Sequence, residues 1–113
     1  MGEISFESLM QHGEGEERYV NNAVYVGGWN NGQYHGKGKF TWPDGSSYDG
    51  DYVNGIKEGH GVYVYASKKV YKGDWANGKQ EGRGLLLSAE GKTLKRGIWS
   101  QGSYARGEEE VEL

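Results

Sequence analysis

The chain has 113 residues, with 21 Gly, nine Tyr, four Trp, two Phe, no Cys and a formal net charge of −3. This length supports one small domain, and the abundance of aromatic residues argues against a disordered chain. The lack of cysteine excludes a disulfide scaffold, thiolate catalysis and a zinc–thiolate site. No apolar run approaches the roughly 18 residues of a membrane span, and the first residues lack the features of a signal peptide. These features predict a soluble, cytoplasmic protein.

Charge divides the chain into three parts. Residues 1–18 carry −4, residues 19–106 carry +5 and residues 107–113 carry −4. We expect residues 1–24 to form an acidic N-terminal capping segment, as a turn or strand, because repeat sheets need covered ends. Residues 103–113 are predicted to be an acidic tail. The apolar residues expected to contribute to the cap are Ile4, Phe6, Leu9, Met10, Tyr19, Val20 and Val24.

A 23-residue repeat fills the middle of the chain. Tyr25-Val26-Gly27-Gly28-Trp29 recurs as Tyr48-Asp49-Gly50-Asp51-Tyr52 and as Tyr71-Lys72-Gly73-Asp74-Trp75. Each copy continues with Asn-Gly and then with Gly-x-Gly. A partial fourth copy, with Gly97-Ile98-Trp99 and Gln101-Gly102, follows one residue late and has Lys95 at the Tyr position. Such self-similarity is typical of repeat architectures. The predicted repeat region is 25–102, with copies at 25–47, 48–70, 71–93 and 94–102.

Each copy is predicted to be a β-hairpin. Tyr, Trp, Val and Phe favour strands, and Asn-Gly between two such runs is a strong turn signal because both residues accept positive φ. A regular ladder from Asn31-Gly32 places Tyr25 opposite Gly38 and Gly27 opposite Gly36. The glycines would then leave space for the tyrosine rings to lie on the neighbouring backbone. The same spacing predicts two further pairs, Tyr48 with Gly61 and Tyr71 with Gly84.

The side-chain alternation of strands assigns the two faces of the predicted sheet. Tyr25, Gly27 and Trp29 share one face with Phe40 and Trp42. Tyr48 of the next copy joins that face if the link from Trp42 has an odd number of loop residues. Pro43-Asp44-Gly45 fits a three-residue loop. The link through Glu90-Gly91 has one residue more, which predicts a change of loop type or a bulge. Because only one face is aromatic, we expect an all-β, elongated, single-layer antiparallel sheet of stacked hairpins with exposed edges.

These residues resemble the MORN repeat family, whose pattern is Tyr-x-Gly-x-Trp-x-x-Gly-x-x-x-Gly-x-Gly. The resemblance covers residues 25–93 as three copies and 94–102 as a partial copy; Tyr52 replaces the usual Trp in the second. It implies a non-catalytic scaffold that binds partners in cytoskeletal, ciliary or membrane-associated assemblies. It also implies a partner-binding aromatic groove formed by Tyr25, Trp29, Tyr48, Tyr52, Tyr71, Trp75 and Trp99.

Protein binding is the favoured function, because Tyr and Trp are frequent anchors of protein interfaces. The expected role is a subunit of a larger cytoskeletal or ciliary assembly, with self-association through the sheet edges as a further route. The alternative is a peripheral membrane adaptor that binds acidic phospholipids, although the basic residues are spread among acids without a cluster of four or more. The residues proposed for that alternative are Lys37, Lys39, Lys68, Lys69, Lys72 and Arg83.

Catalysis, cofactors and metals are not expected. His12, His35 and His60 do not have the spacing of a metal site, and Asp49 and Asp51 are expected on a solvated face with no pocket. The glycine motifs lack the helix N-terminus of a phosphate cradle, and the modest positive charge does not favour a nucleic-acid-binding sheet. The sequence therefore predicts a non-enzyme.

Overall fold

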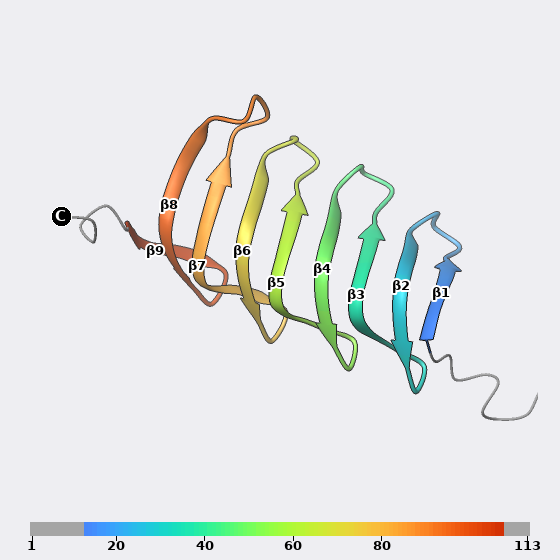
Figure 1. Ribbon diagram of the computed structural model, residues 1–113. Helices are drawn as coiled ribbons and strands as arrows, with labels where there is room; N and C mark the ends of the chain where they lie inside the picture. The colour runs from blue at the N-terminus through green and yellow to red at the C-terminus, as the bar shows by residue number, and fades with distance from the viewer. Residues whose placement is uncertain (1–12, 108–113) are drawn as a thin grey trace, which may run out of the picture.

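The computed structural model describes residues 13–107, and this part of the chain forms one open antiparallel sheet of nine strands (Figure 1). Each strand pairs with the next along the chain, so the sheet is a row of consecutive hairpins with principal dimensions of 63 × 24 × 18 Å. The predicted all-β, single-layer architecture is confirmed. The strands are β1 (Gly13–Arg18), β2 (Val24–Asn30), β3 (Gln33–Thr41), β4 (Ser47–Val53), β5 (Ile56–Val64), β6 (Val70–Ala76), β7 (Lys79–Leu87), β8 (Thr93–Ser100) and β9 (Ser103–Gly107).

The predicted turns are present at the tip of every repeat. Asn31 and Gly32 both have positive φ, 54° and 78°, as a two-residue turn between twisted strands requires. Asn54-Gly55, Asn77-Gly78 and Gln101-Gly102 share this conformation. Because Gln101 adopts it as well, the partial fourth copy also folds as a hairpin, β8–β9.

The opposite ends of the hairpins are joined by the predicted three-residue loops. The Trp42 amide donates to the Ser46 carbonyl at 2.9 Å, and Gly45 adopts φ 93° inside the loop. The last such loop, after Ser88, keeps this pattern, and the extra residue is absorbed in β8. There the register shifts, because Leu86 lies opposite Lys95 whereas Leu87 lies opposite Thr93. The predicted irregularity at this link is confirmed as a bulge.

The predicted register within each hairpin is wrong by two residues beyond the turn. Trp29 lies opposite Tyr34 as a regular ladder requires, but Gly27 lies opposite Gly38 and Tyr25 opposite Phe40. A bulge in β3 causes the shift, and Gly36 within it has φ 82°. A shift of two leaves the assignment of faces intact. The other predicted tyrosine–glycine pairs fail for the same reason, since Gly50 faces Gly61 and Gly73 faces Gly84.

The glycines nevertheless make room for the tyrosine rings. Each ring extends diagonally across the ladder, and a Cβ on Gly84 would lie 2.5 Å from Cε1 of Tyr71. A Cβ on Gly38 would overlap the ring of Tyr25 in the same way. The hydroxyl of Tyr25 then donates to the carbonyl of Gly28 at 2.8 Å, which satisfies the polar end of a fully buried side chain.

The core is a continuous chain of seven rings along the long axis of the sheet. Consecutive rings meet edge to face, with centroids 5.0–5.5 Å apart and interplanar angles of 72–90°, a favourable arrangement for aromatic pairs. We call the side of the sheet that carries these rings the ring face, and the other side the reverse face. In order, the rings are Trp29, Tyr25, Tyr52, Tyr48, Trp75, Tyr71 and Trp99.

Backbone hydrogen bonds also tie each turn to the preceding hairpin. The amide of Gly55 donates to the carbonyl of Tyr34 at 2.8 Å, and Gly78 and Gly102 repeat this bond with Lys57 and Gln80. The stacking of hairpins is therefore fixed at the turns as well as through the ladder.

The sheet extends beyond the predicted range of 25–102 at both ends. β1 pairs with β2 over its whole length and is the edge strand at the N-terminal end, where a cap was expected. β9 pairs with β8 and extends the sheet to Gly107, into the segment predicted as a tail. The expected contributions of Ile4, Phe6, Leu9 and Met10 to a cap lie outside the described residues.

Candidate functional site

The structure places all seven predicted groove residues together, but in the core. Their exposed fractions range from 0% for Tyr25, Tyr48 and Tyr71 to 9% for Trp29. Burial also raises the pKa of the Tyr25 and Tyr71 hydroxyls to about 12. Because so little of these rings reaches the surface, they mainly support a binding face from within the sheet.

A second set of rings supplies the accessible surface of the ring face. These rings sit at the end of each hairpin near the three-residue loops, and successive centroids lie 5.9, 4.5, 5.8 and 4.9 Å apart. All of them are partly or largely exposed. We call this set the exposed ring row: Tyr19, Phe40, Trp42, Tyr63 and Tyr65.

The sequence contained a signal for the exposed ring row that the groove prediction did not use. Tyr19, Trp42 and Tyr65 are spaced by 23 residues, as are Phe40 and Tyr63. They occupy the same positions in successive repeats, outside the Tyr-x-Gly-x-Trp pattern. Phe40 and Trp42 were placed on the correct face but not in the groove.

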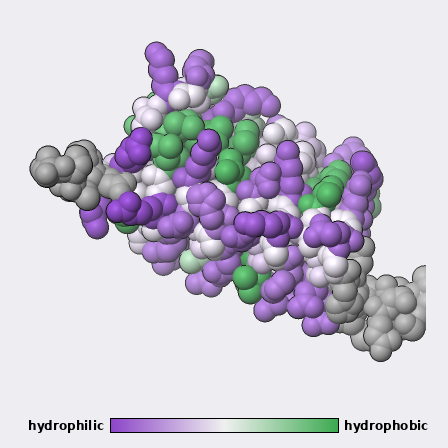
Figure 2. Space-filling view, in the orientation of Figure 1, coloured by the Kyte–Doolittle hydropathy of each residue, from purple (hydrophilic) through white to green (hydrophobic). Residues whose placement is uncertain are grey.

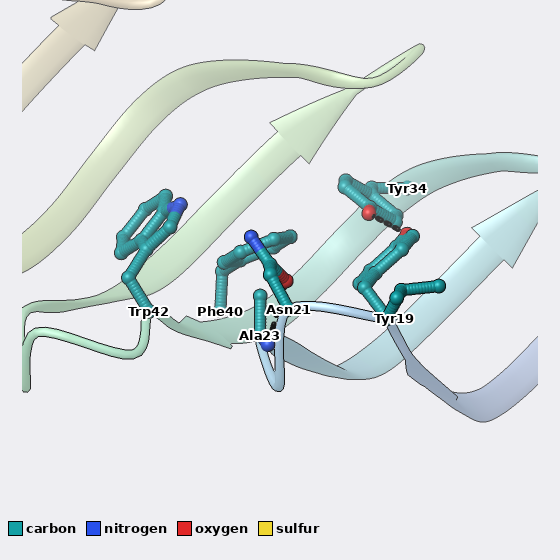
Figure 3. Close-up of a pocket in the computed structure, with 7 residues that line it drawn as sticks. Tyr19, Asn21, Ala23, Tyr34, Phe40 and Trp42 are labelled. Atoms are coloured by element: carbon teal, nitrogen blue, oxygen red, sulfur yellow. Dashed lines mark hydrogen bonds between the residues drawn. The ribbon is translucent and has the colours of Figure 1, made fainter.

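Hollows open along the ring face in the described residues, and two of them are each lined by at least two rings of the exposed ring row. The larger, of about 590 Å³, lies at the N-terminal end between the loop before β2 and the rings of β3, where Phe40 and Trp42 form its wall (Figure 3). The hydroxyls of Tyr19 and Tyr34 are hydrogen-bonded to each other on its far side. The smaller, of about 210 Å³, is lined by Tyr63, Tyr65 and Trp75 and by the turn before β7. Open, mostly aromatic hollows of this kind accept apolar side chains.

One cation lies in the aromatic surface between the hollows. The Nζ of Lys57 is 5.5 Å from the ring centroid of Trp42, 5.4 Å from that of Tyr48 and 5.9 Å from that of Trp75. Desolvation by these rings lowers the pKa of the Lys57 ammonium. Sequence reasoning did not single out Lys57, because a lysine after an Asn-Gly turn is ordinarily a solvated residue.

The six basic residues of the lipid alternative are all exposed, but they do not form one group. Lys37 is paired with Asp51 at 2.5 Å, and Lys39 lies opposite Asp49 in the ladder. Lys68 and Lys69 lie in the loop between β5 and β6. The last two, Lys72 and Arg83, lie on the reverse face of β6 and β7.

Charge is nonetheless divided unevenly along the sheet. Residues 13–60 contain seven acidic and four basic side chains, whereas residues 61–107 contain three acidic and nine basic ones. The ladder brings Lys72 into one cross-strand row with Leu85 and Arg96, and Arg83 into another with Arg106. Each of these two rows in the C-terminal half therefore holds two basic side chains. Figure 2 shows hydrophobic side chains gathered over β6 and β7 on an otherwise mostly hydrophilic surface.

In the described part of the chain, each of the two histidines lies near a group of a neighbouring strand or turn. Nδ1 of His35 accepts a hydrogen bond from the amide of Asn54 at 3.2 Å, and His60 lies 3.8 Å from the carboxylate of Asp74. His12 lies outside the described residues. Among residues 13–107, no group of three or more His, Asp or Glu side chains is arranged to hold a metal ion.

The fold and its ring face define a class of open β-repeat sheets. In this class the hairpins stack through rings and glycines that recur at a fixed spacing along the chain. The chain belongs to the MORN repeat family, whose profile matches residues 10–24, 25–47, 48–70 and 71–93. The family consists of non-catalytic repeats that bind proteins or membranes. The matched segments include 10–24 and do not include the partial copy predicted at 94–102.

A search among curated proteins found no match to this chain. Within residues 13–107, no helix is long and apolar enough to cross a membrane.

Proposed function

We propose that the chain is a non-catalytic scaffold that binds a protein partner on the ring face. The observation that supports this most is the exposed ring row, which continues from the loop before β2 to the end of β5 in a sheet only one layer thick. In a two-layer protein such a face would be covered by a second sheet or by helices. In the described residues it is bordered only by its own loops and turns.

The arrangement of the rings favours a protein segment as the occupant. Tyr and Trp offer large apolar area with few rotatable bonds, so ordering them on binding costs little entropy. The buried core rings also pack against the exposed ring row, since the ring centroids of Tyr63 and Trp75 lie 6.1 Å apart. A preorganised aromatic surface with two hollows matches the way that buried anchor side chains dominate protein interfaces.

Site-specific photocrosslinking in cells tests this proposal. A photoreactive phenylalanine analogue would replace Tyr65 on the ring face and, as the matched control, Val26, which is 51% exposed on the reverse face. We expect a discrete protein adduct from position 65 that is lost when Trp42→Ala is added. An adduct from position 26 alone, or no adduct from position 65, would contradict ring-face binding.

The cellular setting is a further part of the proposal. The family resemblance supports a cytoplasmic role as a subunit of a cytoskeletal or ciliary assembly, and self-association through β1 or β9 remains a prediction. Imaging of the tagged full chain tests the setting. Co-localisation with cytoskeletal or ciliary structures is expected, and a uniform cytoplasmic signal that is unchanged in Trp42→Ala would count against it.

The second candidate is binding to an anionic membrane through the reverse face of the C-terminal half. It is favoured by the nine bases of residues 61–107, four of which align across β6–β9, Lys72 with Arg96 and Arg83 with Arg106. Each base near an anionic surface contributes about 1 kcal/mol. Flotation with phosphatidylserine vesicles at physiological salt tests it. Retention that is lost in Lys72→Glu/Arg83→Glu but kept in Lys39→Glu would support this candidate, whereas no retention would exclude it.

A further inference from the structure

One position on the ring face changes its chemistry from repeat to repeat. It is the second residue after each turn, and it lies opposite the last core ring of the hairpin. The residue that faces it on the other strand is a ring in every hairpin: Trp29, Tyr52, Trp75 and Trp99. The varying position is occupied by Tyr34, Lys57, Gln80 and Tyr104 in successive hairpins.

The equivalent residues in the hairpins before and after that of Lys57 make different contacts. Tyr34 stacks on Tyr25, with centroids 3.9 Å apart, so it completes the aromatic core. Gln80 is 7% exposed, and its amide donates to the hydroxyl of Tyr65 at 2.9 Å. Both side chains therefore find a partner inside the sheet. Lys57 brings a full charge to the same place.

Among the described residues, the ammonium of Lys57 has aromatic neighbours and no ion-pair partner. Three rings surround it at centroid distances of 5.4–5.9 Å, and these contacts stabilise a cation only modestly. Within residues 13–107, no carboxylate forms an ion pair with Lys57, whereas Lys37 on the reverse face contacts Asp51. Burial lowers the pKa of Lys57, and desolvation is its only cause. Part of the free-energy cost of desolvating the Lys57 ammonium is therefore already present in the free protein.

The Lys57 ammonium also lies next to rings that line two apolar hollows. Trp42, whose ring contacts the Lys57 ammonium, lines the larger hollow, and Trp75, whose ring also contacts it, lines the smaller. A segment that lies along the ring face and fills both hollows passes over the ammonium. A carboxylate at that point would meet a partly desolvated cation, and such charge-assisted contacts are stronger than neutral hydrogen bonds.

We propose that Lys57 is the anchor for a carboxylate of the bound protein segment, in which an Asp or Glu lies between two bulky apolar side chains. This inference rests on the proposed function and adds the chemistry of the partner. The two hollows take the apolar side chains, and Lys57 selects for the acid between them. A segment with a neutral or basic residue at that point would leave the ammonium without an anion under a covering ligand, which is unfavourable.

A fragment titration tests the anion preference without knowledge of the partner. The isotope-labelled full chain is titrated with 4-phenylbutyrate and, as the matched neutral probe, with 4-phenylbutyramide, while the tryptophan indole signals are followed by NMR. Both probes are expected to shift the signals of Trp42 and Trp75. The carboxylate is expected to bind about tenfold more tightly, as a hydrogen bond to a charged group predicts.

Three variants assign the preference to a residue. Lys57→Gln is expected to abolish it, Lys57→Arg to retain it, and Lys72→Gln on the reverse face to leave it unchanged. If Lys57→Gln reduced the folded population, Lys57→Arg would still test the inference. This variant is required to bind the carboxylate more tightly than the amide. Lys95 is the other lysine tested, because its Nζ lies 4.7 Å from the ring centroid of Tyr104. A preference that survives in Lys57→Gln but is lost in Lys95→Gln would assign it to Lys95 and overturn the inference.

The outcomes separate this inference from the function on which it rests. Equal binding of the two probes at Trp42 and Trp75 would overturn the role of Lys57, while the ring face would still be shown to accept apolar groups. If neither probe shifted the signals of Trp42 or Trp75, the hollows would not accept apolar groups. In that case the proposed binding mode and the role of Lys57 would both fail.

Discussion

The two faces of this sheet share one backbone but differ in how regularly their side chains repeat. On the ring face the same types of side chain return every 23 residues, and seven rings touch edge to face from Trp29 to Trp99. On the reverse face the equivalent positions change from repeat to repeat, as with Lys39, Val62 and Leu85. The comparison indicates that periodic packing on one face holds the hairpins together. The other face is left free to vary in charge.

The same contrast exists within the ring face. The core rings are fully or nearly fully buried, whereas the exposed ring row covers them and remains accessible. Stability is therefore assigned mainly to the core rings and binding mainly to the exposed ring row, and Trp75 contributes to both because it also lines the smaller hollow. Each of the following predictions tests a part of this division.

The largest effect is expected when a core ring is compared with an exposed one. Trp75→Ala removes a ring that is 7% exposed and that donates from Nε1 to the carbonyl of Gly61 at 3.2 Å. The expected loss in the free energy of unfolding is about 4 kcal/mol. Trp42→Ala, in the exposed ring row, is expected to cost about 1 kcal/mol. Denaturant unfolding of both variants measures the difference, and equal losses would contradict the division between core and binding rings.

The glycines beneath the rings provide the second prediction. Gly84→Val places a branched side chain within 2.5 Å of the Tyr71 ring and close to its hydroxyl. We expect a loss of about 3 kcal/mol, at the upper end of the range for overpacked sites. Thermal and denaturant unfolding measure it.

Gly36→Ala is the matched control for that prediction. A Cβ at Gly36 meets nothing within 4 Å, but the residue has φ 82°. Only the strain of a left-handed conformation is added, about 1 kcal/mol. If Gly36→Ala were as damaging as Gly84→Val, conformational freedom rather than space for the rings would explain the glycine pattern.

The bulge at Gly36 also marks the limit of what the sequence could predict. The 23-residue period and the turn residues were sufficient for the hairpins, the loops and the two faces. The register failed because Gly36 could serve equally as space for a ring or as a positive-φ residue, and the sequence pattern does not distinguish the two. A shift of two residues leaves no trace in the alternation of side chains.

The candidate site was predicted less completely, for a related reason. Membership of a face follows from alternation, but burial depends on how neighbouring hairpins stack. Tyr48 and Tyr63 share the ring face and lie opposite each other in the ladder, yet only Tyr48 is fully buried. The surroundings of Lys57 arise from rings on β4, on β6 and in the loop after β3. The basic rows of the C-terminal half arise from residues far apart along the chain. Neither arrangement exists in any local stretch of sequence.

The core tyrosines predict a loss of stability in alkali. Burial raises the pKa of Tyr25 and Tyr71 from 10.0 to about 12, so the folded protein holds these protons at a pH where the unfolded chain releases them. The resulting stability is fully present below pH 10 and falls as the pH rises from 10 to about 12. Tyrosinate absorbance during a pH titration should show late-titrating groups, and it should lose them in denaturant. Ionisation of all tyrosines in one step at the unfolded pKa would contradict the burial of the core hydroxyls.

The smallest effect is expected on the reverse face, where Lys37 and Asp51 form an ion pair across β3 and β4. The Lys37 side chain is 81% exposed, so solvent and salt screen the attraction. Lys37→Gln is expected to change the free energy of unfolding by about 0.5 kcal/mol or less, and less still at high salt. Asp51 is expected to matter more, because its carboxylate also accepts the amide of His60 at 3.2 Å, beside the bulge in β5. Denaturant unfolding of Lys37→Gln and Asp51→Asn at low and high salt separates the two contributions. A loss for Lys37→Gln comparable to that for Trp75→Ala would show that the reverse face also holds the repeats together.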